Sequence, residues 1–338
     1  MRKEVVWAIV AGIIFGVTIG FGVWRINSSL KSKDNTTLAS PTPQPALPSE
    51  LKITLDKPEN EDVVVDSSVT VSGITKNLAW VAISGENGDF ITQADDKGVF
   101  SQDVDLNPGV NQIKIAAFDK DGAQSATQVI VVYSSLFKKN TLTPTTSPVP
   151  SEASGDAAIR QRVEEKVAEA INHPKAFLGT VTDITDSTIQ IKSLEGDIRQ
   201  ISATPDSVTV IDNRDDANKE IKLTDIAIGD FLVAMGYKGS NNVLIAQRIL
   251  ITDAVKTPQI NAASGKITDK SAGTLTVTMV RGETTTLTPN YLTDIETLKD
   301  GKEVAISLSK ISEGDTVIFI MDNGGKTQKL RSIFLIKI

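Results

Sequence analysis

A long apolar run without a charged side chain lies near the start of the chain, over residues 5–24. As a helix at 1.5 Å per residue, this run would be about 30 Å long, which matches the hydrocarbon core of a bilayer. Basic residues flank both ends, and Trp7 and Trp24 lie where the two interfaces would be. The run is longer than the core of a cleaved signal peptide. It therefore predicts an uncleaved signal-anchor, with a transmembrane helix over 5–24 in an anchor spanning 1–33.

Small side chains recur at every fourth position of this predicted helix, at Ala8, Gly12, Gly16 and Gly20. A stripe of this kind lets two membrane helices approach closely, so it predicts a homodimer formed through the transmembrane helix. The alternative is that glycine is simply frequent in membrane helices.

Two segments rich in proline and threonine, 34–50 and 136–155, divide the rest of the chain. Such segments cannot build a packed core and favour extended conformations, so we expect them to be linkers. Spacers followed by small β-domains are typical of the outer side of a bacterial membrane. We therefore expect a single-pass cell-membrane protein with a cytoplasmic N-terminus and extracytoplasmic C-terminal domains.

Short segments of alternating apolar and polar residues fill the stretch 51–135, as over 69–73. Alternation with a period of two is typical of strands that bury one face. Turn-forming pairs such as Asn87-Gly88 and Asp121-Gly122 separate the segments. About seven strands at this spacing predict an antiparallel, immunoglobulin-like β-sandwich.

Several motifs of this stretch form a consistent series. They are Pro58, VTVSG over 69–73, VAISG over 81–85 and DDKGVFSQDVDLNPGVNQIKIAAFDKDG over 95–122, followed by a final apolar strand. The series resembles bacterial immunoglobulin-like modules of the glucodextranase domain-B type and covers nearly all of 51–135. The resemblance implies a spacer, adhesion unit or accessory module.

The period of the pattern changes over 156–173, where Ile159, Val163 and Val167 lie on one stripe of a helix and charged residues lie elsewhere. Pro174 would end this helix. The pattern predicts one amphipathic helix that docks on the domain after it. A coiled-coil partner helix is the alternative, but the stripe is too short for several heptads.

The remaining sequence repeats itself. Residues 179–192 align without gaps to 265–278, and 223–237 align to 308–322. The alignment predicts two tandem domains from one duplicated ancestor, over 174–256 and 257–338. About five strands around one core in each copy suggest a small OB-like β-barrel. The predicted fold class is thus all-β and modular: a transmembrane helix, a sandwich, an amphipathic helix and two barrels.

Each copy opens on glycine and carries a Gly-Asp pair before a strongly apolar strand. In the first copy these features are Gly179-Thr180-Val181, the run 229–236 and the final 246–249. They resemble a family of uncharacterised bacterial extracytoplasmic OB-like domains. The second copy departs from the pattern at Ile267 and at Met321-Asp322. The resemblance implies a fold and no known activity.

Composition removes several kinds of chemistry. The chain has no cysteine, so it has no disulfide, thiolate nucleophile or cysteine metal site, and its one histidine, His173, leaves a single candidate imidazole base. No nucleophile-elbow, zinc-protease, P-loop or dinucleotide motif is present. The net charge of −7 disfavours a nucleic-acid surface. We therefore expect no enzyme, no catalytic residues, no cofactor and no nucleic-acid partner.

Two acidic turns of the sandwich are the only candidate metal ligands in the pattern. Their carboxylates, Asp95, Asp96, Asp119 and Asp121, have the oxygen chemistry that Ca²⁺ prefers. Aspartate and glycine are equally typical of ordinary hairpin turns, and neither turn continues into the calcium-loop pattern that ends in glutamate. A metal site is therefore not expected, and these four residues are weak candidates.

The features together predict a membrane-anchored protein with a structural or protein-interaction role at the cell envelope. Its expected partners are the lipid bilayer and other envelope proteins or glycans. The alternative function is a glycan-binding accessory module, for which Trp80 is the main candidate contact. A core position for Trp80 is an equal alternative, because it lies inside a predicted strand between Ala79 and Val81.

Overall fold

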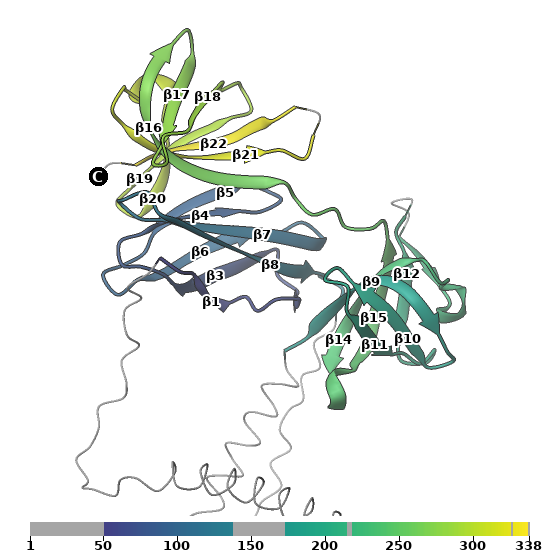
Figure 1. Cartoon of the computed structure of the whole chain (residues 1–338). Helices are drawn as coiled ribbons and strands as arrows, with labels where there is room; N and C mark the ends of the chain where they lie inside the picture. Colours follow the sequence, from purple (N-terminus) through teal and green to yellow (C-terminus); the bar gives the residue numbers. More distant parts are fainter. Residues whose placement is uncertain (1–50, 138–172, 215–217, 326, 337–338) are drawn as a thin grey trace, which may run out of the picture. The chain divides into compact units, whose positions relative to one another are not determined.

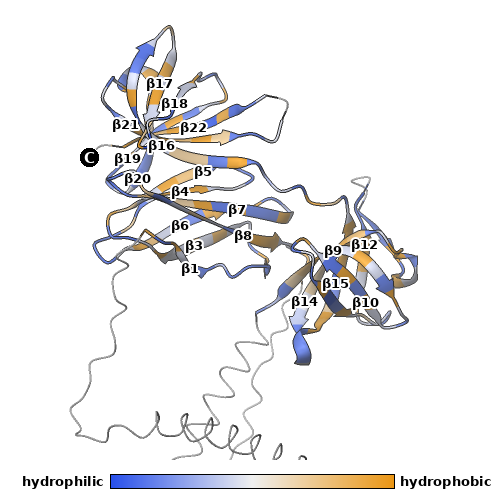
Figure 2. Ribbon diagram, in the orientation of Figure 1, coloured by the Kyte–Doolittle hydropathy of each residue, from blue (hydrophilic) through white to orange (hydrophobic). Residues whose placement is uncertain are grey.

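The structure is a computed structural model that describes residues 51–137, 173–214, 218–325 and 327–336. These residues form strands, turns and three short 3-10 helices (Figure 1). Figure 2 shows the strands banded with hydrophobic and hydrophilic residues, as period-two alternation requires.

The predicted fold class is wrong in its helices. The described residues contain no α-helix, and no helix among them is long and apolar enough to cross a membrane. The prediction of a single-pass membrane protein and its localisation are corrected accordingly. The segment 5–24, with Ala8, Gly12, Gly16 and Gly20, and the segment 156–172 lie outside the described residues.

The first module is a sandwich of two sheets. One sheet has the order β1-β3-β6, and the other has the order β5-β4-β7-β8-β2, in which only the β2–β8 pair is parallel. Their bounds are β1 Thr54–Lys57, β2 Asp62–Val64, β3 Ser68–Ile74, β4 Trp80–Ser84, β5 Asp89–Gln93, β6 Val99–Asp105, β7 Gly109–Phe118 and β8 Gln124–Tyr133. The core between the sheets holds Phe100, Ile83 and Ile113, all nearly or fully buried.

Repeat 1 comprises β9–β15 and the 3-10 helices η1 and η2. Its strand pairs form a closed ring, β9-β10-β11-β15-β14 and back to β9, in which only β11 and β15 are parallel. The bounds are β9 Lys175–Ile184, β10 Thr188–Ser193, β11 Ile198–Ser202, β12 Thr209–Asp212, β13 Lys219–Ile221, η1 Leu223–Asp225, β14 Phe231–Lys238, η2 Ser240–Asn242 and β15 Leu244–Thr252. Strand β12 adds to β15 outside the ring, and β13 adds to β12.

Repeat 2 follows the same order of strands but does not close. Its sheet runs β18-β17-β16-β21-β22-β19-β20, and β18 does not pair with β22 as β11 pairs with β15. The bounds are β16 Ile260–Ser271, β17 Thr274–Met279, β18 Thr284–Leu287, β19 Asp294–Lys299, β20 Lys302–Ala305, η3 Leu308–Lys310, β21 Thr316–Asp322 and β22 Lys329–Ile336. The prediction of a second closed barrel is therefore corrected to an open sheet that curls around its own core.

The two repeats share irregular details as well as strand order. Both first hairpins carry a register shift, around Thr182 in repeat 1 and Thr268 in repeat 2, and each threonine hydroxyl donates to a carbonyl of the next strand at 3.3 Å. The Gly-Asp pairs are also equivalent. Gly229 and Gly314 have positive φ, and the carboxylates of Asp230 and Asp315 accept hydrogen bonds from the backbone N–H three residues earlier. The motif is thus a turn that launches β14 and β21.

The opening glycine of each repeat is explained by close approach of backbones. A Cβ at Gly179 would lie 2.2 Å from the carbonyl oxygen of Lys192, and a Cβ at Gly265 would lie 2.8 Å from that of Thr278. Only glycine fits such an approach without shifting the paired strand.

The three described modules belong to one compact unit. Buried apolar residues are continuous from the first module to each repeat. Val63 and Val132 pack with Leu178 and Val233 of repeat 1, and Phe118 and Ala82 pack with residues of repeat 2 such as Phe334. The outer face of the sandwich is therefore an interface.

Candidate functional site

Trp80, the candidate glycan contact, lies on the outer face of the sandwich, in β4. It is opposite Phe118 of β7 and Gln93 of β5 in the strand register. Its side chain is half-buried against the apolar cluster shared with repeat 2. A cleft of about 470 Å³ is lined by Trp80, Gln93, Phe118, Thr278 and Val280, among others. Trp80 thus packs at an interface and also lines a cleft; glycan binding there stays a prediction.

The acidic turns use their carboxylates to hold the backbone. Asp95 Oδ1 accepts hydrogen bonds from the N–H groups of Lys97 and Val99, both at 2.8 Å. Asp119 does the same for its own turn and also binds Lys76 Nζ at 2.7 Å. Burial raises the pKa of Asp119, but the hydrogen bonds from Lys76 and Ala123 lower it. These hydrogen bonds outweigh burial, so the net shift of the pKa is downward.

The other two acidic candidates, Asp96 and Asp121, are exposed in the same turns. Within the described ranges, no group of three histidine, aspartate or glutamate residues is placed to hold a metal ion. The structure therefore gives these turns a backbone role and brings no further ligand to them.

A buried lysine joins the first module to repeat 1. Lys175 Nζ, in β9, lies 2.6 Å from Glu59 Oε2 and 2.7 Å from Asp62 Oδ1, and it also donates to the Asn60 carbonyl at 3.3 Å. Burial lowers the pKa of Lys175, but the hydrogen bonds to Asp62 and Glu59 outweigh it and raise the pKa overall. The Lys175 hydrogen bond in turn lowers the pKa of Glu59.

An arginine supports the same junction. Arg199 of β11 forms an ion pair with Glu61, and both side chains are largely buried. Its guanidinium carbon also lies 5.2 Å from the centre of the Phe177 ring. The backbones join here too, because Ala176 N–H donates to the Glu61 carbonyl at 2.7 Å. The acidic segment 59–62 therefore binds the cations Lys175 and Arg199 of repeat 1.

A buried carboxylate joins the first module to repeat 2. The side chain of Asp89, in β5, is 1% exposed and binds two groups of β22. Ser332 Oγ donates to Asp89 Oδ2 at 2.6 Å, and Arg331 Nη2 lies 3.1 Å from Oδ1. Arg331 also donates to the Gly85 carbonyl at 2.9 Å. Burial raises the pKa of Asp89 although Arg331 and Ser332 oppose that shift.

Two further carboxylates lie at this junction. Glu303 of β20 accepts a hydrogen bond from Ile91 N–H of β5, and burial raises its pKa. The pKa of Glu296, in β19, is raised by burial and then by the like charges of Glu303, Asp294 and Asp89. Arg331 is the cation that pairs with Asp89 at this junction. Burial thus raises the pKa of all three carboxyl groups at the junction with repeat 2.

Acidification is therefore expected to increase the stability of the wild-type chain relative to that of the Glu296→Gln variant. The folded-state pKa of Glu296 is raised, so its contribution to stability is complete below the ordinary glutamate pKa and is lost as pH rises through the raised value. The difference in melting temperature, Glu296→Gln minus wild type, should increase from about pH 4 to about pH 7. Thermal unfolding of the full chain over this range measures it. The exposed Glu283→Gln serves as the control, and a difference that does not change with pH contradicts the assignment.

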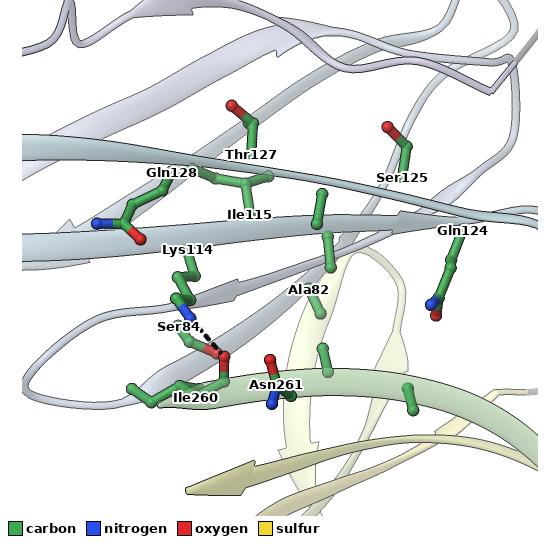
Figure 3. Close-up of a pocket in the computed structure, with 14 residues that line it drawn as sticks. Ala82, Ser84, Lys114, Ile115, Gln124, Ser125, Thr127, Gln128, Ile260 and Asn261 are labelled. Atoms are coloured by element: carbon green, nitrogen blue, oxygen red, sulfur yellow. Dashed lines mark hydrogen bonds between the residues drawn. The ribbon is translucent and has the colours of Figure 1, made fainter. Parts of the chain in front are cut away.

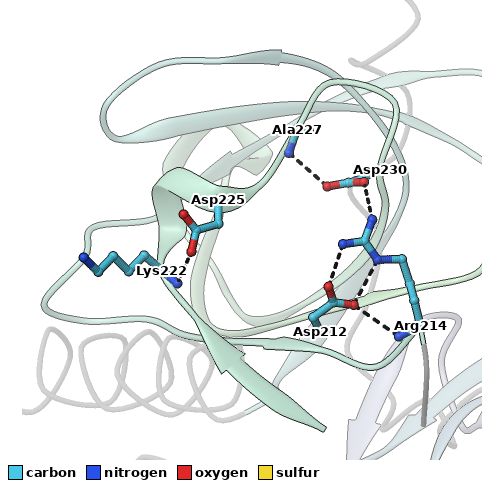
Figure 4. A network of polar contacts seen from close by, with 6 residues as sticks. All are labelled: Asp212, Arg214, Lys222, Asp225, Ala227 and Asp230. Atoms are coloured by element: carbon cyan, nitrogen blue, oxygen red, sulfur yellow. Dashed lines mark hydrogen bonds and ion pairs between the residues drawn. The ribbon is translucent and has the colours of Figure 1, made fainter. Parts of the chain in front are cut away.

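A third ionic network stays inside repeat 1 (Figure 4). Arg214 binds Asp212 through two nitrogens, at 2.9 and 2.6 Å, and binds Asp230 at 3.0 Å. The hydrogen bonds from Arg214 lower the pKa of Asp212 to about 2. Asp230 is also the turn residue that caps Ala227 N–H at 2.9 Å. The network connects the end of β12 to the start of β14. Both carboxylates are paired with Arg214, which is typical of a structural ion-pair network and not of a catalytic dyad.

A groove of about 630 Å³ at the junction with repeat 2 lies beside β8 and the first half of β16 (Figure 3). Lys114 crosses it and donates to the Ile260 carbonyl at 2.9 Å. Nothing in the amino-acid pattern singled out this groove, because its walls are 130 or more residues apart in the chain.

No protein-family model matches the chain, and no curated protein matches it in sequence. Among solved structures it is similar to a tetra-tandem repeat in the extending region of a large adhesion protein (12% identity, TM-score 0.21, covering 85% of this chain and 73% of that one). It is also similar to Drosophila Unr CSD456 (14%, 0.18, 78% and 99%) and to a bacterial ice-binding adhesin (15%, 0.18, 85% and 95%). Two of these three are adhesin segments. At such TM-scores the likeness establishes neither fold nor function, and both family resemblances stay predictions.

Proposed function

We propose that this chain is a non-catalytic structural protein that holds three β-modules as one unit and presents their outer surfaces for adhesion or assembly with partner proteins or glycans. The observation that carries the proposal is the use of charge. Three cations of the repeats bind carboxylates of the first module: Lys175, Arg199 and Arg331.

This use of charge differs from that of an active site. Catalytic groups need a free proton or electron pair directed at a cavity that a substrate can enter. Here the buried carboxylates of Asp62 and Asp89 face cations of another module, and the carboxylates of the turns accept backbone N–H groups. The polar groups therefore stabilise the relative arrangement of modules.

Photo-cross-linking of the full chain in the cells that make it tests the proposal. A benzophenone amino acid replaces Tyr291, whose side chain is 93% exposed in repeat 2. We expect discrete adducts with one or a few macromolecules at this or another exposed position, such as Leu136. Turnover of a small molecule by the purified chain, with no adduct from any module, would contradict the proposal.

A further inference from the structure

The groove in Figure 3 has a floor of small side chains. The floor is the outer face of the sandwich, where Ala82, Ala116 and Ala126 lie opposite one another on β4, β7 and β8. One wall is the start of β16, with Ala262 and Ala263. Side chains of this size leave the backbones of the surrounding strands accessible. The volume of about 630 Å³ is within the range of ligand sites.

The wall at β16 is an unpaired strand edge. From Ile260 to Ser264, β16 pairs with β21 on one side, whereas β17 pairs only from Gly265 onward. In an antiparallel pair, alternate residues direct both backbone groups to the same side. Ile267 exchanges backbone hydrogen bonds on the β21 side, so Ala262 directs its N–H and C=O to the other side. The Ile260 carbonyl, two residues earlier, follows the same alternation and accepts Lys114 Nζ from the groove.

The opposite side of the groove is a second unpaired edge. Strand β8 pairs with β7 along its whole length, but β2 joins its other side only from Val131. Ile130 N–H donates to Asn60 Oδ1 and the Ile130 carbonyl accepts from Glu61 N–H, both on the side away from β7. By the same alternation, Gln128 and Ala126 direct their N–H and C=O groups to this outer side. Within the described residues, no strand pairs with this part of β8 or with the start of β16.

Apart from Lys114, which binds the Ile260 carbonyl, neither edge carries the protection that is usual at exposed edges. Edge strands are normally guarded by charged residues, proline or bulges. The segment 124–128 reads QSATQ and the segment 260–264 reads INAAS, with no charge, no proline and no register shift. Among the described residues that line the groove, Lys114 is the only charged one, so this lining carries positive charge and no carboxylate.

We propose that this groove binds an extended peptide segment of a partner protein by β-strand addition. The occupant is a strand with small or β-branched side chains toward the alanine floor and with neutral or acidic character that suits Lys114. Backbone groups of Ala126 or Ala262 supply the hydrogen bonds, and the floor selects side-chain size. The proline-rich linker 136–155 is a poor occupant, because its prolines lack the N–H donors that pairing requires.

The test is selection of random heptapeptides displayed on phage against the immobilised full chain. We expect enriched peptides whose binding falls by about tenfold or more in Ala126→Arg, because the long side chain fills the groove. Ser101→Arg, an exposed strand position on the other sheet, is the matched control and should leave binding unchanged. Methylation of alternate backbone nitrogens in an enriched peptide should abolish its binding in one of the two registers only.

No enrichment, or binding that is equal in Ala126→Arg and wild type, would overturn the inference. Concentration-dependent dimerisation of the full chain that Ala126→Arg abolishes would also overturn it, since a second copy would then cover the groove. The inference rests on the proposed interaction role, but the two fail separately. The cross-links from Tyr291 report on partners elsewhere, and melting of Ala126→Arg at the wild-type temperature shows that the modules are intact.

Discussion

Replacement of Lys175 by alanine is expected to lower the free energy of unfolding of the full chain by about 3 kcal/mol. The substitution leaves Asp62, whose side chain is 18% exposed, without its cation at the junction with repeat 1. The loss of Glu59 as a partner contributes little, because that side chain is 70% exposed and water replaces the contact. Urea unfolding of the full chain gives the number.

Lys192→Ala is the matched control for this prediction, because Lys192 is an exposed lysine of the neighbouring strand β10. Its effect should stay within about 0.5 kcal/mol. The double variant Lys175→Ala with Asp62→Ala should recover part of the loss, since it leaves no unpaired buried charge. Strictly additive losses would show that Lys175 and Asp62 do not interact.

Arg331→Ala is expected to have the larger effect, about 3–5 kcal/mol, because its partner Asp89 is the most deeply buried carboxylate of a junction. Ser332 Oγ would remain as a hydrogen-bond donor, but one hydroxyl does not neutralise the charge. The expected result is that repeat 2 separates from the first module before either unfolds. Arg281→Ala, an exposed arginine of the same repeat, should leave the junction intact.

The strands of the modules could be predicted from local pattern, and the contacts between modules could not. Alternation over 69–73 gave a strand because one face of β3 is buried, and the duplicated segments gave equivalent strands because the repeats share even the shift at Thr182 and Thr268. In contrast, Glu59 and Lys175 are 116 residues apart in the chain. No periodicity links these two residues, so their contact could not be predicted from the sequence.

The same limit applies to the closure of each repeat's sheet, to the position of Trp80 and to the groove at Ala126. The pairing of β11 with β15 closes repeat 1, whereas β18 and β22 stay apart in repeat 2. Trp80 was identified as core or contact because its strand has two faces, and only packing shows that its outward face meets repeat 2. The groove at Ala126 was missed because alanine and serine carry no chemical signal in a sequence.

Spin-label distances across the junction with repeat 2 test most directly whether the modules form one unit. Because the chain has no cysteine, labels can be placed at Ser101→Cys in the first module and Ser271→Cys in repeat 2, both exposed. The structure predicts one narrow distance distribution for the full chain and a broad one after Arg331→Ala. A distribution that is already broad in the unsubstituted junction, and unchanged by Arg331→Ala, would contradict the account.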